Sequence, residues 1–254
     1  MGPAIKFWLA IILFPLCAFA QIGVDAPILY QQPVASGGGG NNLTIVQSAS
    51  TNGPQTTTPV TVTFSSVTSG NMLEIQAVIY DGSVHTIATG DISKTGTSTT
   101  GTLVMDIATN EVSGSVGLGL FHLPITGNGN VTIALTKTGA QYLDLMVTEV
   151  HNYNTSTPVD VSGKNTTATL KTASSGSLAS VTTAGAVFYL AEVEAAGNWY
   201  SVWSDTQTGV DTNASTVTYM GQYKLQSSSP SAITNSTDAT STLSKIIWSH
   251  VQSN

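Results

Sequence analysis

Hydrophobic and polar residues alternate with a period of two along most of the chain after residue 42, which is the pattern of half-buried β-strands. The alternation is clearest in Gln141–Asn154. Segments of the same kind are Leu43–Gln47, Val60–Phe64, Asn71–Tyr80, Val84–Ala88, Leu103–Ile107, Val116–Leu123, Val131–Leu135, Ala184–Glu194, Thr216–Leu225 and Leu243–Val251. No segment combines a helical period with helix caps. The pattern therefore predicts an all-β fold: an antiparallel two-sheet β-sandwich, jelly-roll or Ig-like, in a single domain.

The phase of the alternation assigns polar side chains to the two faces of a strand. Asp144 and Thr148 lie opposite the leucines of Gln141–Asn154, and Glu74 lies opposite the apolar face of Asn71–Tyr80. We expect these three side chains on the solvent side. Glu149 and His151 instead continue the apolar phase, so we expect both of them to point toward the core.

The first twenty residues have the features of a secretory signal peptide. Lys6 supplies a positive charge, Phe7–Phe19 is an apolar run that is too short for a good membrane span, and Ala18–Ala20 fits the rule for signal cleavage. We therefore expect a signal peptide at 1–20, secretion or display at the cell surface, and no membrane span in the mature chain.

A flexible segment is expected between the signal peptide and the folded domain. Residues 21–42 contain Pro27, Pro33 and the run Gly37–Gly40, and they lack an apolar period. The β-sandwich domain then occupies residues 43–254. An internal echo exists within it, because Ser66–Ser69 and Ser180–Thr183 each precede a long apolar strand at an offset of 114 residues (180 − 66 = 114). Equivalent strands in two halves of one sandwich would explain the echo, as would chance in a Thr-rich chain.

Charge excludes several classes of partner. The seven basic residues are all lysines, the net charge is −7, and 8% of the residues are charged. Because the lysines are few and scattered, they cannot form a basic patch. Nucleic acid and anionic lipid are therefore not expected partners. The single cysteine, Cys17, lies within the predicted signal peptide, which leaves the mature chain without a disulfide or a cysteine nucleophile.

The order of elements resembles a loosely defined, largely uncharacterised group of secreted bacterial β-sandwich proteins and modules. The resemblance rests on Val67–Leu73, on Val147–His151 followed by Pro158–Asp160, and on the closing strand around Trp248. In that group the middle strand commonly carries a glutamate followed by an aromatic residue and a glycine. Glu149 matches, whereas His151 and Asn152 depart from the pattern. The resemblance implies secretion and a sandwich, and it transfers no catalytic residue.

Two pairs of residues are candidates for catalysis. Glu149 and His151 lie two apart on one strand, and they could act as general acid and base. The alternative is a buried, hydrogen-bonded glutamate that holds strand register or ties down a loop. Glu192 and Glu194 form a second pair, and Glu149 with Glu192 could form the two carboxylates of a glycosidase on a concave sheet.

Three aromatic residues, Trp199, Tyr200 and Trp203, form a candidate ligand-binding group. Gly197 and Asn198 nearby indicate a loop, in which exposed aromatic faces could stack on sugar rings. The alternative is that one or two of these side chains cover the end of the sandwich.

The sequence predicts no cofactor and no metal centre. The four histidines have no paired spacing of the zinc type; they are His85, His122, His151 and His250. Calcium could be held by loop carboxylates and carbonyls, although no twelve-residue calcium loop occurs; the candidates are Asp81, Asp91 and Asp205.

Two hypotheses about function follow. The first is a secreted, non-enzymatic β-sandwich that acts in adhesion, matrix or glycan binding, with an extracellular glycan or a surface protein as partner and with self-association into a homo-oligomer as a variant. The second is a carbohydrate-active enzyme that uses Glu149 with Glu192 or Glu194. The enzyme requires at least two of these carboxylates in an open groove, which separates the two hypotheses.

Overall fold

Strands dominate the part of the chain that the structure describes. The computed structural model describes residues 42–51, 55–56, 58–80, 86–109, 116–140, 142–168, 172–175, 177–193, 199–201, 207–214, 217–226, 234–237 and 243–254. These residues contain sixteen strands in four antiparallel sheets, and one short 3-10 helix, η1 (Thr89–Asp91). The sheets do not close into a barrel. The predicted antiparallel all-β class is therefore confirmed, but the structure has four sheets where the sequence pattern predicts two.

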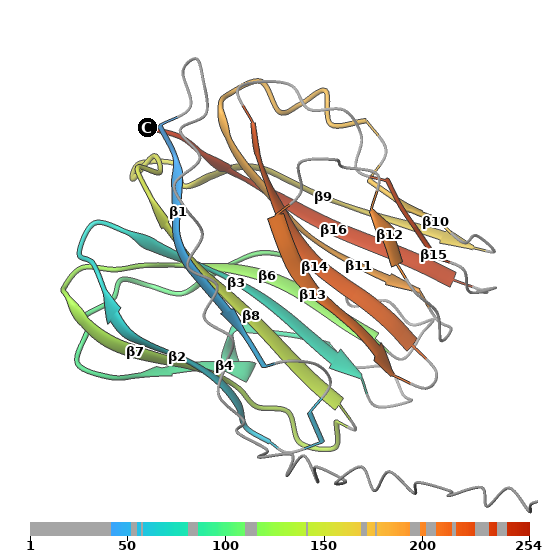
Figure 1. Cartoon of the computed structure of the whole chain (residues 1–254), viewed down its shortest axis with the longest axis horizontal. Helices are drawn as coiled ribbons and strands as arrows, with labels where there is room; N and C mark the ends of the chain where they lie inside the picture. Colours follow the sequence, from blue (N-terminus) through green and yellow to red (C-terminus); the bar gives the residue numbers. More distant parts are fainter. Residues whose placement is uncertain are drawn as a thin grey trace, which may run out of the picture.

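The first eight strands form one five-stranded and one three-stranded sheet (Figure 1). The five-stranded sheet has the order β1-β8-β3-β6-β5, and the three-stranded sheet has the order β2-β7-β4. Their bounds are β1 (Thr44–Ser50), β2 (Val60–Val67), β3 (Met72–Tyr80), β4 (Ile92–Thr95), β5 (Val104–Ala108), β6 (Val116–Pro124), β7 (Gly129–Leu135) and β8 (Tyr142–His151).

The last eight strands repeat this arrangement. Their five-stranded sheet has the order β9-β16-β11-β14-β13, and their three-stranded sheet has the order β10-β15-β12. Each strand of the second half therefore holds the same place as the strand eight positions earlier in the chain order, for example β11 and β3. Their bounds are β9 (Val159–Ala168), β10 (Thr172–Ser174), β11 (Gly185–Val193), β12 (Trp199–Ser201), β13 (Gln207–Ala214), β14 (Val217–Gln226), β15 (Thr234–Thr237) and β16 (Leu243–Gln252). The chain is thus built from two halves with the same topology.

The echo in the sequence marks this repeat. Ser66–Ser69 leads into β3 and Ser180–Thr183 leads into β11, the equivalent strand of the second half. Val67 and Val181, which are 114 residues apart, are both buried. The two segments of the echo thus precede strands that hold equivalent places in the strand order of the two halves.

The two five-stranded sheets pack face to face in the middle of the molecule. β3, β5 and β6 of the first half contact β11, β16 and β9 of the second half. Two apolar clusters fill this interface, and they include Leu120 with Ile247 and Met72 with Phe188. The other face of the first five-stranded sheet packs on β2, β4 and β7 through a third cluster, which contains Leu145 and Val147. β10 and β12 lie against the second five-stranded sheet.

This layering corrects three predictions of exposure. Glu74, Asp144 and Thr148, which the alternation assigns to the solvent side, are buried, with exposed fractions of 0%, 4% and 0%. Period-two alternation does separate the two faces of β3 and β8 correctly. The prediction is wrong because both of those faces are covered: one by the three-stranded sheet and the other, for β3, by the second half.

Several polar segments are strands that the alternation does not reveal. β4 starts inside a Ser/Thr/Gly-rich stretch, and β9, β10, β13 and β15 are rich in Thr, Ser and Asn. Such strands lack the apolar residues that mark one face. Of the predicted strand Val84–Ala88, residues 84 and 85 lie outside the described part of the chain, and residues 86–88 are not strand.

The predicted signal peptide at 1–20, and residues 21–41 of the predicted flexible segment, lie outside the described residues. Within the residues that the structure describes, no helix is long and apolar enough to cross a membrane.

Candidate functional site

Glu149 lies near the end of β8, and its carboxylate is enclosed by the loop that joins β2 to β3. One oxygen, Oε1, accepts hydrogen bonds from the Thr68 backbone N–H at 2.9 Å and from Asn71 Nδ2 at 2.6 Å. The other, Oε2, accepts from Nε2 of Gln47 at 2.5 Å, and Gln47 is the residue beside Glu149 in the register of β1 and β8. Glu149 is 1% exposed. Its carboxylate therefore ties β1 and the β2–β3 loop to β8.

His151 is connected to Glu149 through Asn71 and does not enter the core. The His151 side chain is exposed, and its Nδ1 lies 2.8 Å from Oδ1 of Asn71. Because the Asn71 amide donates to Glu149, its oxygen accepts from His151, so Nδ1 carries the hydrogen. The predicted inward orientation of His151 is wrong because β8 ends at this residue, beyond the layers that cover its centre.

The strand that carries Glu192 is not a neighbour of the strand that carries Glu149. Glu192 lies in β11, in register with Lys245 of β16, and Glu194 lies outside the described residues. β8 and β11 belong to different sheets. Glu149 shares the face of β8 that packs on β2-β7-β4, whereas β11 packs on the opposite side of that five-stranded sheet. β8 and β11 are therefore neither neighbouring strands nor strands that face one another across the side of β8 that carries Glu149.

Trp199 and Tyr200 lie in a strand rather than in the predicted loop. They form most of β12, which pairs with β15 and occupies an outer position in the order β10-β15-β12. The third aromatic residue, Trp203, lies outside the described residues. The sequence reading missed this strand because three residues are too few for a period.

The second half carries a polar tie at the position equivalent to Glu149. His250 of β16 is completely buried, and its Nδ1 lies 2.6 Å from Oδ1 of Asp160, whose Oδ2 accepts a hydrogen bond from Thr183 at 2.9 Å. Like Glu149, His250 lies beside a register shift in the neighbouring strand, which is β9 here and β1 in the first half. In both halves a buried polar group thus links β8 or β16 to the segment before β3 or β11.

A second polar group, which the sequence reading missed, crosses the first five-stranded sheet on the face that meets the second half. We name it the polar row: Ser48, Thr148, Glu74, His122 and Asp106. Neighbouring strands place Ser48 beside Thr148, Thr148 beside Glu74, and Glu74 beside His122. Nδ1 of His122 lies 2.5 Å from Oδ1 of Asp106, at the register shift between β5 and β6. No motif marks this row, because its members come from five separate strands.

The polar row contains two buried carboxyl groups. Burial raises the pKa of Glu74 well above its usual range, and the nearby charge of Asp106 raises it further, whereas the hydrogen bond from Ser249 opposes the rise. Burial also raises the pKa of Asp106, against the effect of His122. Oε2 of Glu74 and Oδ2 of Asp106 have no hydrogen-bond partner among the described residues. A proton on Glu74 relieves the cost of burying two like charges.

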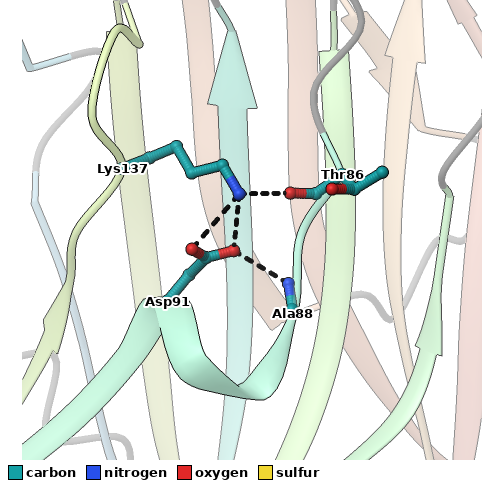
Figure 2. A network of polar contacts seen from close by, with 4 residues as sticks. All are labelled: Thr86, Ala88, Asp91 and Lys137. Atoms are coloured by element: carbon teal, nitrogen blue, oxygen red, sulfur yellow. Dashed lines mark hydrogen bonds and ion pairs between the residues drawn. The ribbon is translucent and has the colours of Figure 1, made fainter.

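Asp91, a candidate calcium ligand in the sequence, is paired with a lysine (Figure 2). Lys137 Nζ lies 3.0 and 3.2 Å from the two carboxylate oxygens, and it donates to the Thr86 carbonyl oxygen at 2.6 Å. One of these carboxylate oxygens also accepts from the Ala88 backbone N–H at 2.9 Å. The Lys137 ammonium group therefore lies where a calcium ion bound to Asp91 would lie. The other two candidates, Asp81 and Asp205, lie outside the described residues.

In the described part of the chain, no three His, Cys, Asp or Glu side chains are grouped to hold a metal ion. Comparison with known proteins finds no matching family model, no similar curated protein and no similar solved structure. The interpretation of function therefore rests on the chain's own residues.

Proposed function

We propose that the protein is a secreted, non-catalytic binding protein that acts at the cell exterior in adhesion, matrix or glycan binding. The observation that carries this proposal is the burial and the hydrogen bonding of the Glu149 carboxylate. The candidate catalytic carboxylate is 1% exposed, and both of its oxygens accept hydrogen bonds from the protein. A general acid or nucleophile needs access to substrate, which this carboxylate does not have.

The repeat supports a structural interpretation of these polar groups. Each half places a buried polar tie at the same point of its topology, although the side chains differ: Glu149 in one half and His250 with Asp160 in the other. Different chemistry at equivalent positions is expected when the common requirement is to hold a loop. We further propose that each half is a jelly-roll sandwich, because each half has eight strands and the two halves share one strand order.

The outer face of β2-β7-β4 indicates a neutral partner. The outward positions of these strands are mainly hydroxyl residues, together with Asn130 and Ala134, with Thr63 beside Thr132 and Thr132 beside Thr95; Lys94 of β4 is also exposed. The hydroxyls of Thr63 and Thr132 are 2.8 Å apart. A face rich in hydroxyl groups is suited to neutral, hydroxyl-bearing partners such as glycans, and β12 contains Trp199 and Tyr200, residue types that stack on sugars.

The test is a glycan array with a polysaccharide pull-down on residues 21–254, the predicted mature chain. Trp199→Ala and Trp203→Ala are measured beside the wild type, with Ser156→Ala, an exposed residue between β8 and β9, as the control away from both proposed surfaces. We expect binding that either tryptophan variant reduces by at least tenfold and that the control retains. Hydrolysis of a bound polysaccharide, or absence of binding by folded, monomeric wild type, would contradict the proposal.

A further inference from the structure

The polar row lies in the interface between the two halves, and the second half contributes directly to it. Ser249 of β16 donates a hydrogen bond to Oε1 of Glu74 at 3.0 Å, and Gln76 of β3 donates to the Tyr189 backbone oxygen of β11 at 2.8 Å. Glu74, Ser249 and Gln76 are all at most 1% exposed. These bonds join the two five-stranded sheets at their centre, where the apolar clusters exclude water.

The ionisable groups around Glu74 come from each element packed on it. In its own sheet these are Asp106 of β5 and His122 of β6, which pair with one another. In the second half, the ionisable side chains on the side of the interface are Lys245, which lies four residues before Ser249 on the same face of β16, and Tyr223 of β14, which shares an apolar cluster with Met72 and whose pKa burial raises to about 12. His122 is paired with Asp106, and the Glu74 carboxyl is the group of the polar row that accepts a hydrogen bond from Ser249.

We propose that a proton on Glu74 holds the two halves of the chain together, and that its loss as the pH rises loosens the interface between the two five-stranded sheets. The neutral carboxyl accepts the Ser249 hydrogen bond without placing a second negative charge beside Asp106. The ionised carboxylate would be a second buried negative charge beside Asp106, and water reaches it when the sheets separate.

The sign of the pH dependence follows from the direction of the shift. The pKa of Glu74 is raised in the native protein, so the stabilisation from its proton is complete below the unfolded pKa of about 4.3 and is lost as the pH rises through the native pKa. Between these two values each opening of the interface releases one proton. The opening equilibrium should therefore rise about tenfold per pH unit and then become flat.

The experiment is hydrogen exchange of the full chain as a function of pH, compared between variants so that the intrinsic pH dependence of exchange cancels. Glu74→Gln keeps the shape of the side chain and removes the proton. We expect the amides of β3, β6, β11 and β16 in the wild type to lose protection, relative to Glu74→Gln, by about tenfold per pH unit until the plateau. Amides of β2 and β7, which lie outside the interface, should show no such difference.

Ser249→Ala tests the same proposal by raising the native pKa of Glu74, whereas Glu74→Gln removes the titrating group. Its hydroxyl stabilises the ionised carboxylate, so its removal should move the plateau to higher pH. Asp91→Asn, a carboxyl far from the interface, should keep the wild-type slope. The proposal is overturned if Glu74→Gln keeps that slope, or if β2 and β7 lose protection with the interface strands. Should Glu74→Gln fail to fold, an unmoved plateau in Ser249→Ala would overturn it alone.

Discussion

Replacement of Glu149 by alanine tests whether this carboxylate is a structural tie. The substitution removes the acceptor of three hydrogen bonds, from Gln47, Thr68 and Asn71. Asn71 is 2% exposed, and a buried donor without a partner costs about 1–3 kcal/mol. The Thr68 backbone N–H and the Gln47 amide lie nearer the surface, so water replaces part of their loss, at a cost of about 0.5–1.5 kcal/mol each.

Together these contributions predict that Glu149→Ala lowers the free energy of unfolding by about 4 kcal/mol. For a chain of this length the corresponding decrease of the melting temperature is about 8–16 °C. Glu149→Gln is the matched control. It keeps the volume and one acceptor oxygen, so it should cost about 1 kcal/mol.

Urea denaturation followed by two probes measures the effect and places it in the chain. Tryptophans 199, 203 and 248 all lie in the second half, and Trp8 lies in the predicted signal peptide. Tryptophan fluorescence of the predicted mature chain therefore reports on the second half, while far-ultraviolet circular dichroism reports on both halves. We expect Glu149→Ala to shift the dichroism transition more than the fluorescence transition if the halves unfold separately, and both equally if they unfold together.

The reasoning would be refuted by a Glu149→Ala variant whose free energy of unfolding stays within about 0.5 kcal/mol of the wild type, the range of an ordinary surface substitution. Such a result would mean that the carboxylate adds nothing to stability, and a functional role for Glu149 would then have to be reconsidered.

Two further predictions concern single contacts. Lys137→Met should cost less than about 1 kcal/mol at low salt and almost nothing at 1 M salt, because the pair with Asp91 is partly exposed and screened; thermal melts at both salt concentrations measure this difference. Gly163→Ala should cost about 1–3 kcal/mol and alter the near-ultraviolet dichroism of Trp248, since an added Cβ would lie 2.6 Å from the indole ring; unchanged dichroism and stability would contradict the close packing.

Local pattern was a reliable guide where a strand has one apolar face. The inward positions of β2 and the inner face of β3 follow from period-two alternation, and Leu73, Ile75, Ala77 and Ile79 do form part of the core. Pattern was not sufficient for β9, β13 and β15, whose Thr- and Asn-rich sequences resemble those of loops. Their strand state depends on hydrogen bonding to neighbours that are distant in the sequence.

For the polar groups too, local pattern predicts some features and not others. The sequence identified Glu149 as out of place on an apolar face, and it left a loop tie open as the alternative to catalysis; the contacts of Glu149 agree with the tie. His151 shares the phase of Glu149 and yet is exposed, because phase does not tell where the covering layers stop. The link through Asn71 joins residues 80 positions apart, which no local spacing reveals.

The sequence by itself determined the all-β class, the inner faces of the apolar strands, the acidic and arginine-free composition, and a trace of the internal repeat. These properties are local, or they are sums over the chain. Only the tertiary structure decided that the chain forms two halves of equal topology, that their five-stranded sheets face one another, and that Glu74 is buried between them. The physical reason is that one alternating strand has the same pattern whether water or another sheet covers its polar face, so the second face is assigned only by packing.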